Sequence, residues 1–467
     1  MAERFDWWHP NLDGQRHTAL IDYVRALEED QYELQNRFFQ CGWLYQNRRI
    51  MGAEGEWRDA APFSDAATVT TNLVESAVDS GVALVAKNLS RITVQTDGAT
   101  WALQRQAVAL ERWIEAEFER CGVYELGQDH FRDAEVFGMG VLKVIPDRHA
   151  SPVRPCVDRV LIDQVIVDER ECRNSPPRKI HERHFIDKDV LKALYPDVDP
   201  ALIDEAQKST GHQWTSFRAI EPSQVAVVEA WKLPNRAGAG DGVHVIACST
   251  VDLFSEPWTE DETPHIFFPW SKPVRGFYPR GLVEQLVGVQ LRLNRLNYAI
   301  ARAQDLVALP RGFVLPGDKK LAEQINSGHG QIYVSNTGKG VMWHTPTAFG
   351  PEIYSFRREL KQEGMEAAGM SPAFSQGLAP AGVESAVAIR EVAQREVGRL
   401  AIPAQRYENV FLAIARKLLR LQRSLGGSPT TVWRSGSVMQ RIDWSKVDLD
   451  ESMYTMSLAA ASILSRS

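Results

Sequence analysis

The sequence has few cysteines and no long apolar run. Its five cysteines are scattered along 467 residues, are odd in number and form no CxxC pair. This usage argues against a disulfide framework, so we expect reduced thiols in a cytoplasmic environment. No run of about 18 apolar residues occurs, and the N-terminal segment MAERFDWWHP lacks the apolar core of a signal peptide. The sequence therefore predicts neither a membrane span nor secretion. The cysteines are Cys41, Cys121, Cys156, Cys172 and Cys248.

The chain also lacks an excess of positive charge. It contains 53 lysines and arginines against 60 aspartates and glutamates, which gives a net charge of −7. Proteins that coat DNA through phosphate contacts are basic, so a DNA partner would not be held tightly. Hydrophobic residues make up 44% and charged residues 24%, which indicates a folded globular protein rather than a disordered one. The length suggests roughly three domains.

Apolar residues at helical spacing mark three helices near the start of the chain. Leu20 and Val24 belong to a series that predicts one long amphipathic helix over residues 15 to 46. The same kind of spacing predicts helices over residues 70 to 90 and 101 to 120. We expect these three helices to pack together.

A β-rich region follows the third helix. Gly138 and Gly140 lead from a further helical segment into the short apolar run VLKVI, which predicts a helix-to-strand turn. Segments rich in β-branched and aromatic residues then predict a mixed α+β domain over residues 141 to 270. The segment RAGAGDG at 236 to 242 has spaced glycines but no Lys-Ser/Thr pair, so we interpret it as a hairpin turn rather than a phosphate-binding loop.

A long helix begins the second half of the chain. From residue 281 to Leu309, apolar residues repeat at spacings of three and four, which predicts a rod of about 42 Å. Arg292, Arg295 and Arg302 lie off this apolar stripe, and Pro310 ends the helix. The leucine spacing alone would also suit a simple dimeric coiled coil.

Shorter elements and a second long helix complete the pattern. The pattern over residues 310 to 347 predicts short strands joined by turn residues. The pattern over residues 351 to 368 predicts a returning helix. The segment SPAFSQGLAPAG is too rich in proline and glycine to continue it and is expected to be a flexible loop. Helical spacing resumes from Glu384 to Leu425, where Pro403 must introduce a kink.

This order of elements resembles the portal proteins of tailed bacteriophages. The tract HIFFPWSKPVRGFYPRGLVEQLVGVQLRLNRLNYAI resembles their aromatic and proline-rich entry to the first stem helix. DAEVFGMGVLKVIPD is similar to a wing segment in which a helix passes through glycines into a strand, and SAVAIREVAQREVGRLAIPAQRYENVFLAIARKLL is similar to the helix after the tunnel loop. The resemblance covers roughly residues 20 to 460, and the order of the matches gives it specificity.

The resemblance implies an α+β portal fold with long stem helices, an α/β clip insertion, a mixed α+β wing and a long proline-kinked wing helix. Its expected parts are a wing over 1–280, a stem helix over 281–309, a clip over 310–347, a second stem helix over 348–370, a tunnel loop over 371–384, a kinked wing helix over 385–425, and over 426–467 the wing return and the start of a short or missing crown.

The resemblance also implies a function. Portal subunits form a dodecameric ring at one capsid vertex, through which double-stranded DNA enters during packaging and leaves during ejection. They dock the terminase large subunit and head-tail adaptors and contact the major capsid protein and possibly a scaffold protein. The expected location is therefore the virion, after assembly in the host cytoplasm, with no enzymatic activity, cofactor or membrane. Twelve subunits of charge −7 would surround the duplex with a repulsive field that favours sliding.

Three sets of residues are implied to serve this function. The stem basic residues expected to face DNA are Arg292, Arg295, Arg302, Arg357, Arg358 and Lys361. The tunnel-loop residues are Ser375, Gln376, Gly377 and Leu378, and the clip residues that contact partners are Lys319, Lys320 and Lys339. Some of the stem residues are expected to bridge neighbouring subunits instead.

Two groups of polar residues leave an enzyme open as the alternative. Cys156, Cys172, His181 and His184 could in principle bind zinc, although their spacing fits no familiar site. The acids of TEDET at 259 to 263 could bind a divalent cation, but a charged surface loop is the commoner meaning of such a run.

His181 and His184 flank Glu182, which invites a general-base interpretation. No nucleophile or oxyanion motif accompanies them, so we interpret them as surface histidines. The rival functions are therefore a metal-dependent DNA hydrolase and a minor capsid or scaffold protein without a pore.

Overall fold

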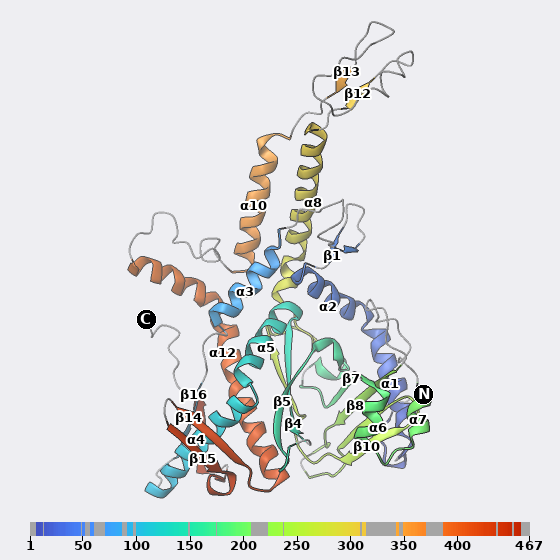
Figure 1. The fold of residues 1–467 in the computed structure, drawn as a ribbon, viewed down its shortest axis with the longest axis vertical. Helices are drawn as coiled ribbons and strands as arrows, with labels where there is room; N and C mark the ends of the chain where they lie inside the picture. Colours follow the sequence, from blue (N-terminus) through green and yellow to red (C-terminus); the bar gives the residue numbers. More distant parts are fainter. Residues whose placement is uncertain are drawn as a thin grey trace. The chain divides into compact units, whose positions relative to one another are not determined.

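The computed structural model divides the chain into two compact units (Figure 1). Met1–Gly42, Val78–Gln285 and Ala381–Ser467 form the first unit, and Trp43–Ala77 with Leu286–Pro380 form the second. The described residues are 6–12, 14–47, 49–51, 57–59, 71–85, 91–96, 100–147, 150–173, 175–206, 223–236, 238–308, 311–313, 342–344, 349–369, 386–435, 438–450 and 453–458.

The chain is of mixed α+β class, as the sequence predicts. Its helices are α1 Arg16–Asp30, α2 Tyr32–Tyr45, α3 Leu73–Val85, α4 Trp101–Arg120, α5 Val123–Phe137, α6 Lys188–Leu194, α7 Pro200–Glu205, α8 Leu282–Ala308, α10 Pro351–Ala367 and α12 Ala386–Leu425. Pro403 lies inside α12, whose ribbon changes direction along its length in Figure 1.

The single helix predicted over residues 15 to 46 is wrong, because Gln31 separates α1 from α2. The side chain of Gln31 binds elsewhere in the first unit: its Nε2 donates to the carbonyl of Val167 at 2.6 Å, and its Oε1 accepts from the hydroxyl of Tyr278 at 3.3 Å. The break thus lies at a residue with tertiary contacts, which the apolar spacing does not reveal.

Two antiparallel sheets form the centre of the first unit. The larger has the order β10-β9-β8-β7-β6, and the smaller has the order β11-β4-β5. The larger sheet contains β6 Val165–Ile166, β7 Lys179–Asp187, β8 Gln224–Lys232, β9 Val243–Ala247 and β10 Asp252–Pro257, and the smaller contains β4 Met139–Asp147, β5 Arg154–Val160 and β11 His265–Pro269.

Among the described residues, four strand pairs lie outside these sheets. Each is antiparallel and two-stranded. They are β1 Arg49–Met51 with β2 Trp57–Asp59, β3 Ile92–Gln95 with β16 Thr455–Leu458, β12 Arg311–Phe313 with β13 Met342–His344, and β14 Thr430–Ser435 with β15 Val438–Asp443.

Helices cover the two sheets separately. Leu20 and Val24 of α1 are fully buried in one core cluster with Val228 and Val245 of the larger sheet. α5 and α12 pack against the smaller sheet, where the ring of Phe268 lies 5.6 Å from that of Phe131. The expected packing of the three N-terminal helices with one another is therefore wrong for α1 and α4, because α1 packs on the larger sheet whereas α4 packs against β3, β14 and α5.

The turn from α5 into β4 depends on glycine, as the sequence predicts. Gly138 has a φ of +95°, and a Cβ at this position would collide with the carbonyl oxygen of Pro279. Gly140 is equally constrained, because a Cβ there would collide with the carbonyl oxygen of His130. The helix can therefore pass directly into the buried strand only through these two residues.

The hairpin predicted at residues 236 to 242 is confirmed. It joins the antiparallel strands β8 and β9. Gly238 and Gly240 both have positive φ, and Asp241 Oδ1 accepts from the backbone N–H of Asn235 at 2.9 Å. The glycines therefore belong to the turn of the β8–β9 hairpin.

The second unit contains the antiparallel helices α8 and α10. Position 364 of α10 lies against the side chain of Val289 in α8, and Arg357 Nη1 donates to Asn297 Oδ1 at 3.3 Å. The contacts progress in opposite directions along the two helices, which establishes their antiparallel orientation. The pair β12–β13 belongs to the segment that connects them (Figure 1).

Candidate functional site

The structure places the six predicted stem residues on exposed surface of the helix pair. Arg292, Arg295 and Arg302 lie on α8. Arg357, Arg358 and Lys361 lie on α10. Within the second unit Arg302 Nη1 donates to the hydroxyl of Tyr298 at 3.1 Å, and Arg357 donates to Asn297. The position off the apolar stripe is as predicted, and contact with DNA stays a prediction.

The other predicted portal residues lie outside the described residues. These are the tunnel-loop residues Ser375, Gln376, Gly377 and Leu378 and the clip residues Lys319, Lys320 and Lys339.

The helix pair exposes apolar as well as basic side chains. Over its 17 residues α10 buries only Gly364 and Met365. Phe356 of α10 is 42% exposed and Tyr298 of α8 is 38% exposed. A helix of this length is marginal in water without an apolar face to bury, so the pair offers surface that a neighbour would stabilise.

The four residues considered for zinc do not come together. Because side chains alternate along β7, His181 and His184 point to opposite faces of the sheet. The ring of His181 contacts those of Trp7 and Tyr23, with centroids 5.6 and 5.2 Å apart. Cys156 lies on β5 of the other sheet. The zinc hypothesis for this set is therefore not supported by the geometry.

The acidic loop at 259 to 263 forms ion pairs with α12. Glu262 Oε2 accepts from Lys417 Nζ of α12 at 2.9 Å, and Arg420 lies 3.8 Å from its other oxygen. The hydrogen bond and charge of Lys417 lower the pKa of Glu262. This carboxylate thus joins the loop to α12, and no cation is needed to neutralise it.

The interpretation of His181 and His184 as surface residues is wrong for His181 and incomplete for His184. His181 is fully buried, whereas the side chain of His184 is 29% exposed. Glu182 between them is 1% exposed. The side chains of Glu182 and His184 belong to a charged group between the two sheets.

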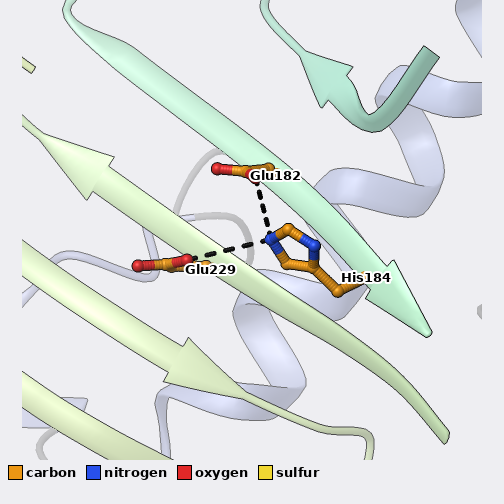
Figure 2. Close-up of side chains that lie close together, drawn as sticks. All are labelled: Glu182, His184 and Glu229. Carbon is orange, nitrogen blue, oxygen red and sulfur yellow. Dashed lines mark ion pairs between the residues drawn. The ribbon is translucent and has the colours of Figure 1, made fainter. Parts of the chain in front are cut away.

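We call this group the inter-sheet ion cluster. Its members come from five strands: Lys143 of β4, Glu182 and His184 of β7, Glu229 of β8, His244 of β9 and His265 of β11. Figure 2 shows how three of them meet, with the ring of His184 between the two carboxylates. The cluster thus joins the smaller sheet, through β4 and β11, to the larger one.

Lys143 is the central cation of the cluster. Its Nζ lies 2.9 Å from Glu182 Oε2 and 2.6 Å from Glu229 Oε2. Burial would lower the pKa of Lys143, but the charges of Glu229 and Glu182 raise it above its ordinary value. The lysine therefore stays charged although its side chain is only 6% exposed.

Histidine side chains also contact both carboxylates. His184 Nε2 lies 2.9 Å and His265 Nε2 3.1 Å from Glu182, and His244 Nε2 lies 2.9 Å from Glu229. Burial would raise the pKa of Glu182, but the hydrogen bonds to His184 and His265 and the charge of Lys143 hold it far below its usual range. Lys143 and His244 similarly lower the pKa of Glu229 to about 2. Both carboxylates are therefore ionised at neutral pH.

Three ligand atoms of the cluster could face a metal ion. The closest approaches are those of His184 Nε2 to Glu182 Oε1 at 2.9 Å and to Glu229 Oε2 at 3.8 Å (Figure 2). Lys143 Nζ already binds both carboxylates, so a divalent ion would have to displace a buried ammonium group. Glu182 also suits a general base poorly, because it is buried and its pKa is far below neutrality. We assign the cluster to the joining of the two sheets.

Sequence analysis missed Lys143, Glu229, His244 and His265. A signal was present, because Lys143 interrupts the apolar run VLKVI and Glu229 interrupts VAVVEAW. A charged residue inside a strand buried on both faces requires a partner. The sequence does not show which strands of the two sheets face each other, so the partners could not be identified.

A second buried carboxyl group, Glu135 of α5, is isolated. It is fully buried beside Gly81, and among the residues that the structure describes neither carboxylate oxygen has a hydrogen-bond partner. Burial, helped by the nearby charge of Asp79, raises the pKa of Glu135 well above its ordinary value. The side chain is therefore expected to be protonated when the first unit is folded.

Replacement of Glu135 by glutamine should flatten the dependence of stability on pH. Because its pKa is raised in the folded protein, Glu135 contributes stability that is full below its unfolded pKa and is lost as pH rises through the folded pKa. Glu135→Gln removes this loss, so the stability of the variant relative to the native chain should rise between pH 5 and pH 8. Urea unfolding at the two pH values measures the difference. An equal effect at both values would show that Glu135 does not titrate, and Glu119→Gln, at an exposed position of α4, is the matched control.

Comparisons with known proteins found no match, neither to a family model nor to a curated protein. In the part of the chain that the structure describes, no helix is long and apolar enough to cross a membrane.

Proposed function

We propose that the chain is a portal protein of a tailed bacteriophage, one subunit of a dodecameric ring at a capsid vertex through which the genome is packaged and ejected. The observation that carries this proposal is the antiparallel pair α8 and α10, separated by a segment with the β12–β13 pair and followed by the proline-containing α12. This is the order of stem, clip, stem and wing helix. The resemblance thus rests on topology as well as on sequence.

The surface of the helix pair supports assembly with further copies. The 27 residues of α8 give a rod of about 40 Å, and α10 has little buried surface of its own. Burial of half-exposed aromatic side chains such as Phe356 would be favourable, whereas the exposed arginines favour contact with water or with opposite charge. Adjacent subunits in a ring would supply the cover on two sides and leave the remaining sides to solvent and DNA.

The net charge of the chain and the basic residues of the helix pair support the proposal of a channel in which DNA slides. A chain of net charge −7 repels the duplex overall, and the six exposed basic residues on α8 and α10 supply weak, salt-sensitive phosphate contacts. The energy for packaging would come from the terminase, since the inter-sheet ion cluster offers no open catalytic site. Terminase and the head-tail adaptors would dock on the clip.

Negative-stain imaging of the purified chain tests the proposal. We expect rings with a central hole, because the helix pair leaves apolar surface that neighbouring subunits cover. Closed assemblies without a hole would favour a scaffold or minor capsid protein. Compact monomers that cleave DNA only with a divalent cation would instead identify the chain as a metal-dependent hydrolase.

A further inference from the structure

Two thiols lie side by side where α4 meets β5. Cys121 directly follows the last residue of α4, and its Sγ lies 3.8 Å from the carbonyl oxygen of Pro155, the residue before Cys156. Each of the Cys121 and Cys156 thiols shifts the pKa of the other, so the two side chains lie close together. Arg120 Nη2 donates to Cys121 Sγ at 3.2 Å and also to the carbonyl of Pro155. The arginine thus holds the two chain segments together at the thiols.

These two cysteines differ from the other three in access to solvent. Cys41, Cys172 and Cys248 are buried, with exposed fractions of 5%, 6% and 0%. Cys121 and Cys156 are both partly exposed. A soluble oxidant can therefore reach the pair, whereas burial protects the other thiols.

The two thiols also differ in acidity. The neighbouring Cys121 thiol lowers the pKa of Cys156, with a further contribution from the charge of Arg120. Cys156 and burial raise the pKa of Cys121. We therefore assign the attack on the oxidant to Cys156 and the resolving step to Cys121.

We propose that Cys121 and Cys156 form a regulated disulfide when the protein meets a small-molecule disulfide such as oxidised glutathione. The Cys156 thiolate attacks one sulfur of the oxidant, which forms a mixed disulfide and releases one thiol. Cys121 then attacks the Cys156 sulfur, and the second thiol leaves. The two protein thiols lose two electrons and two protons, and the oxidant gains both as it becomes two thiols. This inference does not depend on the proposed function.

The bond would connect the end of α4 to β5 and enclose α5 and β4. The enclosed segment is about 35 residues long, so its closure removes conformational freedom from the unfolded chain. We expect the oxidised protein to melt a few degrees higher than the reduced one. The reduced state suits a reducing compartment, and the oxidised state would form after release from it.

The experiment treats the full chain with oxidised glutathione and counts free thiols after denaturation. The proposal requires a fall from five thiols to three, a peptide that links Cys121 to Cys156, and reversal by dithiothreitol. The matched variant Cys248→Ser, at a buried position, should still lose two thiols. Cys121→Ser should retain glutathione on Cys156.

Two results would overturn the proposal. Retention of all five thiols in the native chain would show that the pair is not oxidised. Glutathione that stays attached to Cys156 in the native chain would show that Cys121 does not resolve the mixed disulfide. Because both results come from the native chain, a variant that fails to fold leaves the test intact.

Discussion

Replacement of Lys143 by methionine is expected to destabilise the first unit by roughly 3 to 5 kcal/mol at neutral pH. The lysine lies 2.9 and 2.6 Å from the buried carboxylates of Glu182 and Glu229. Methionine fills similar space but leaves these two negative charges together in a low dielectric, with only histidines to balance them. The cost of an unpaired buried charge exceeds the net benefit of the original ion pair, and this asymmetry makes the effect large.

The loss should shrink in acid. In the native protein the pKa of Glu229 is lowered to about 2, so its stabilising contribution is present above the unfolded pKa and is lost as pH falls through the folded pKa. In Lys143→Met the carboxylates bind protons at higher pH, which relieves their repulsion. The stability difference between variant and native chain should therefore be greatest near pH 7 and smaller near pH 4.

Urea unfolding followed by circular dichroism measures this effect. Lys192→Met is the matched control, because Lys192 also pairs with a carboxylate, Asp204 at 2.7 Å, but on the surface. We expect no measurable change in the control. A Lys143→Met protein that unfolds at the native urea concentration would show that the inter-sheet ion cluster does not hold the sheets together.

Replacement of Gly138 by alanine should be the second most damaging single change. Gly138 has a φ of +95°, where an alanine is strained, and the new Cβ would collide with the Pro279 carbonyl oxygen. Backbone strain of about 1 to 2 kcal/mol and a steric cost of about 1 to 3 kcal/mol add to a loss of about 2 to 5 kcal/mol. The collision is with backbone, so a rotamer change cannot relieve it.

Gly238→Ala separates the two contributions. Gly238 also has a positive φ, +72°, but nothing lies within 4 Å of a Cβ built there. Only the strain should remain, about 1 kcal/mol. Thermal unfolding of both variants measures the comparison. Equal losses would show that the contact of Gly138 with Pro279 contributes nothing to its requirement for glycine.

Local patterns in the sequence predicted most of the helices correctly. The apolar stripe from Leu282 to Ile300 and the returning helix before the proline-rich segment correspond closely to α8 and α10. The break at Gln31 could not be predicted, because the apolar spacing continues through it from α1 into α2. The contacts made by Gln31 are with residues more than a hundred positions away, Val167 and Tyr278, which local spacing cannot show.

The candidate site was less predictable than the helices for the same reason. The charged residues inside β4 and β8 were visible in the sequence, but their pairing depends on the approach of two sheets. His181 and His184 looked alike in sequence, yet strand alternation gives one a buried aromatic environment and the other a place beside Glu182 and Glu229. The hairpin glycines were correctly interpreted because their role is local.

The position of α12 late in the chain has a consequence for synthesis on the ribosome. Tyr407 of α12 packs against both Phe131 and Phe268, so these two rings lack this contact until more than a hundred further residues are made. At about 5 to 20 residues per second, the delay is of the order of ten seconds. β3 waits longer still, because its partner β16 lies more than 350 positions later in the chain. The nascent chain therefore exposes aromatic surface that is prone to aggregation through much of its synthesis, and protection by chaperones would favour a good yield of folded protein.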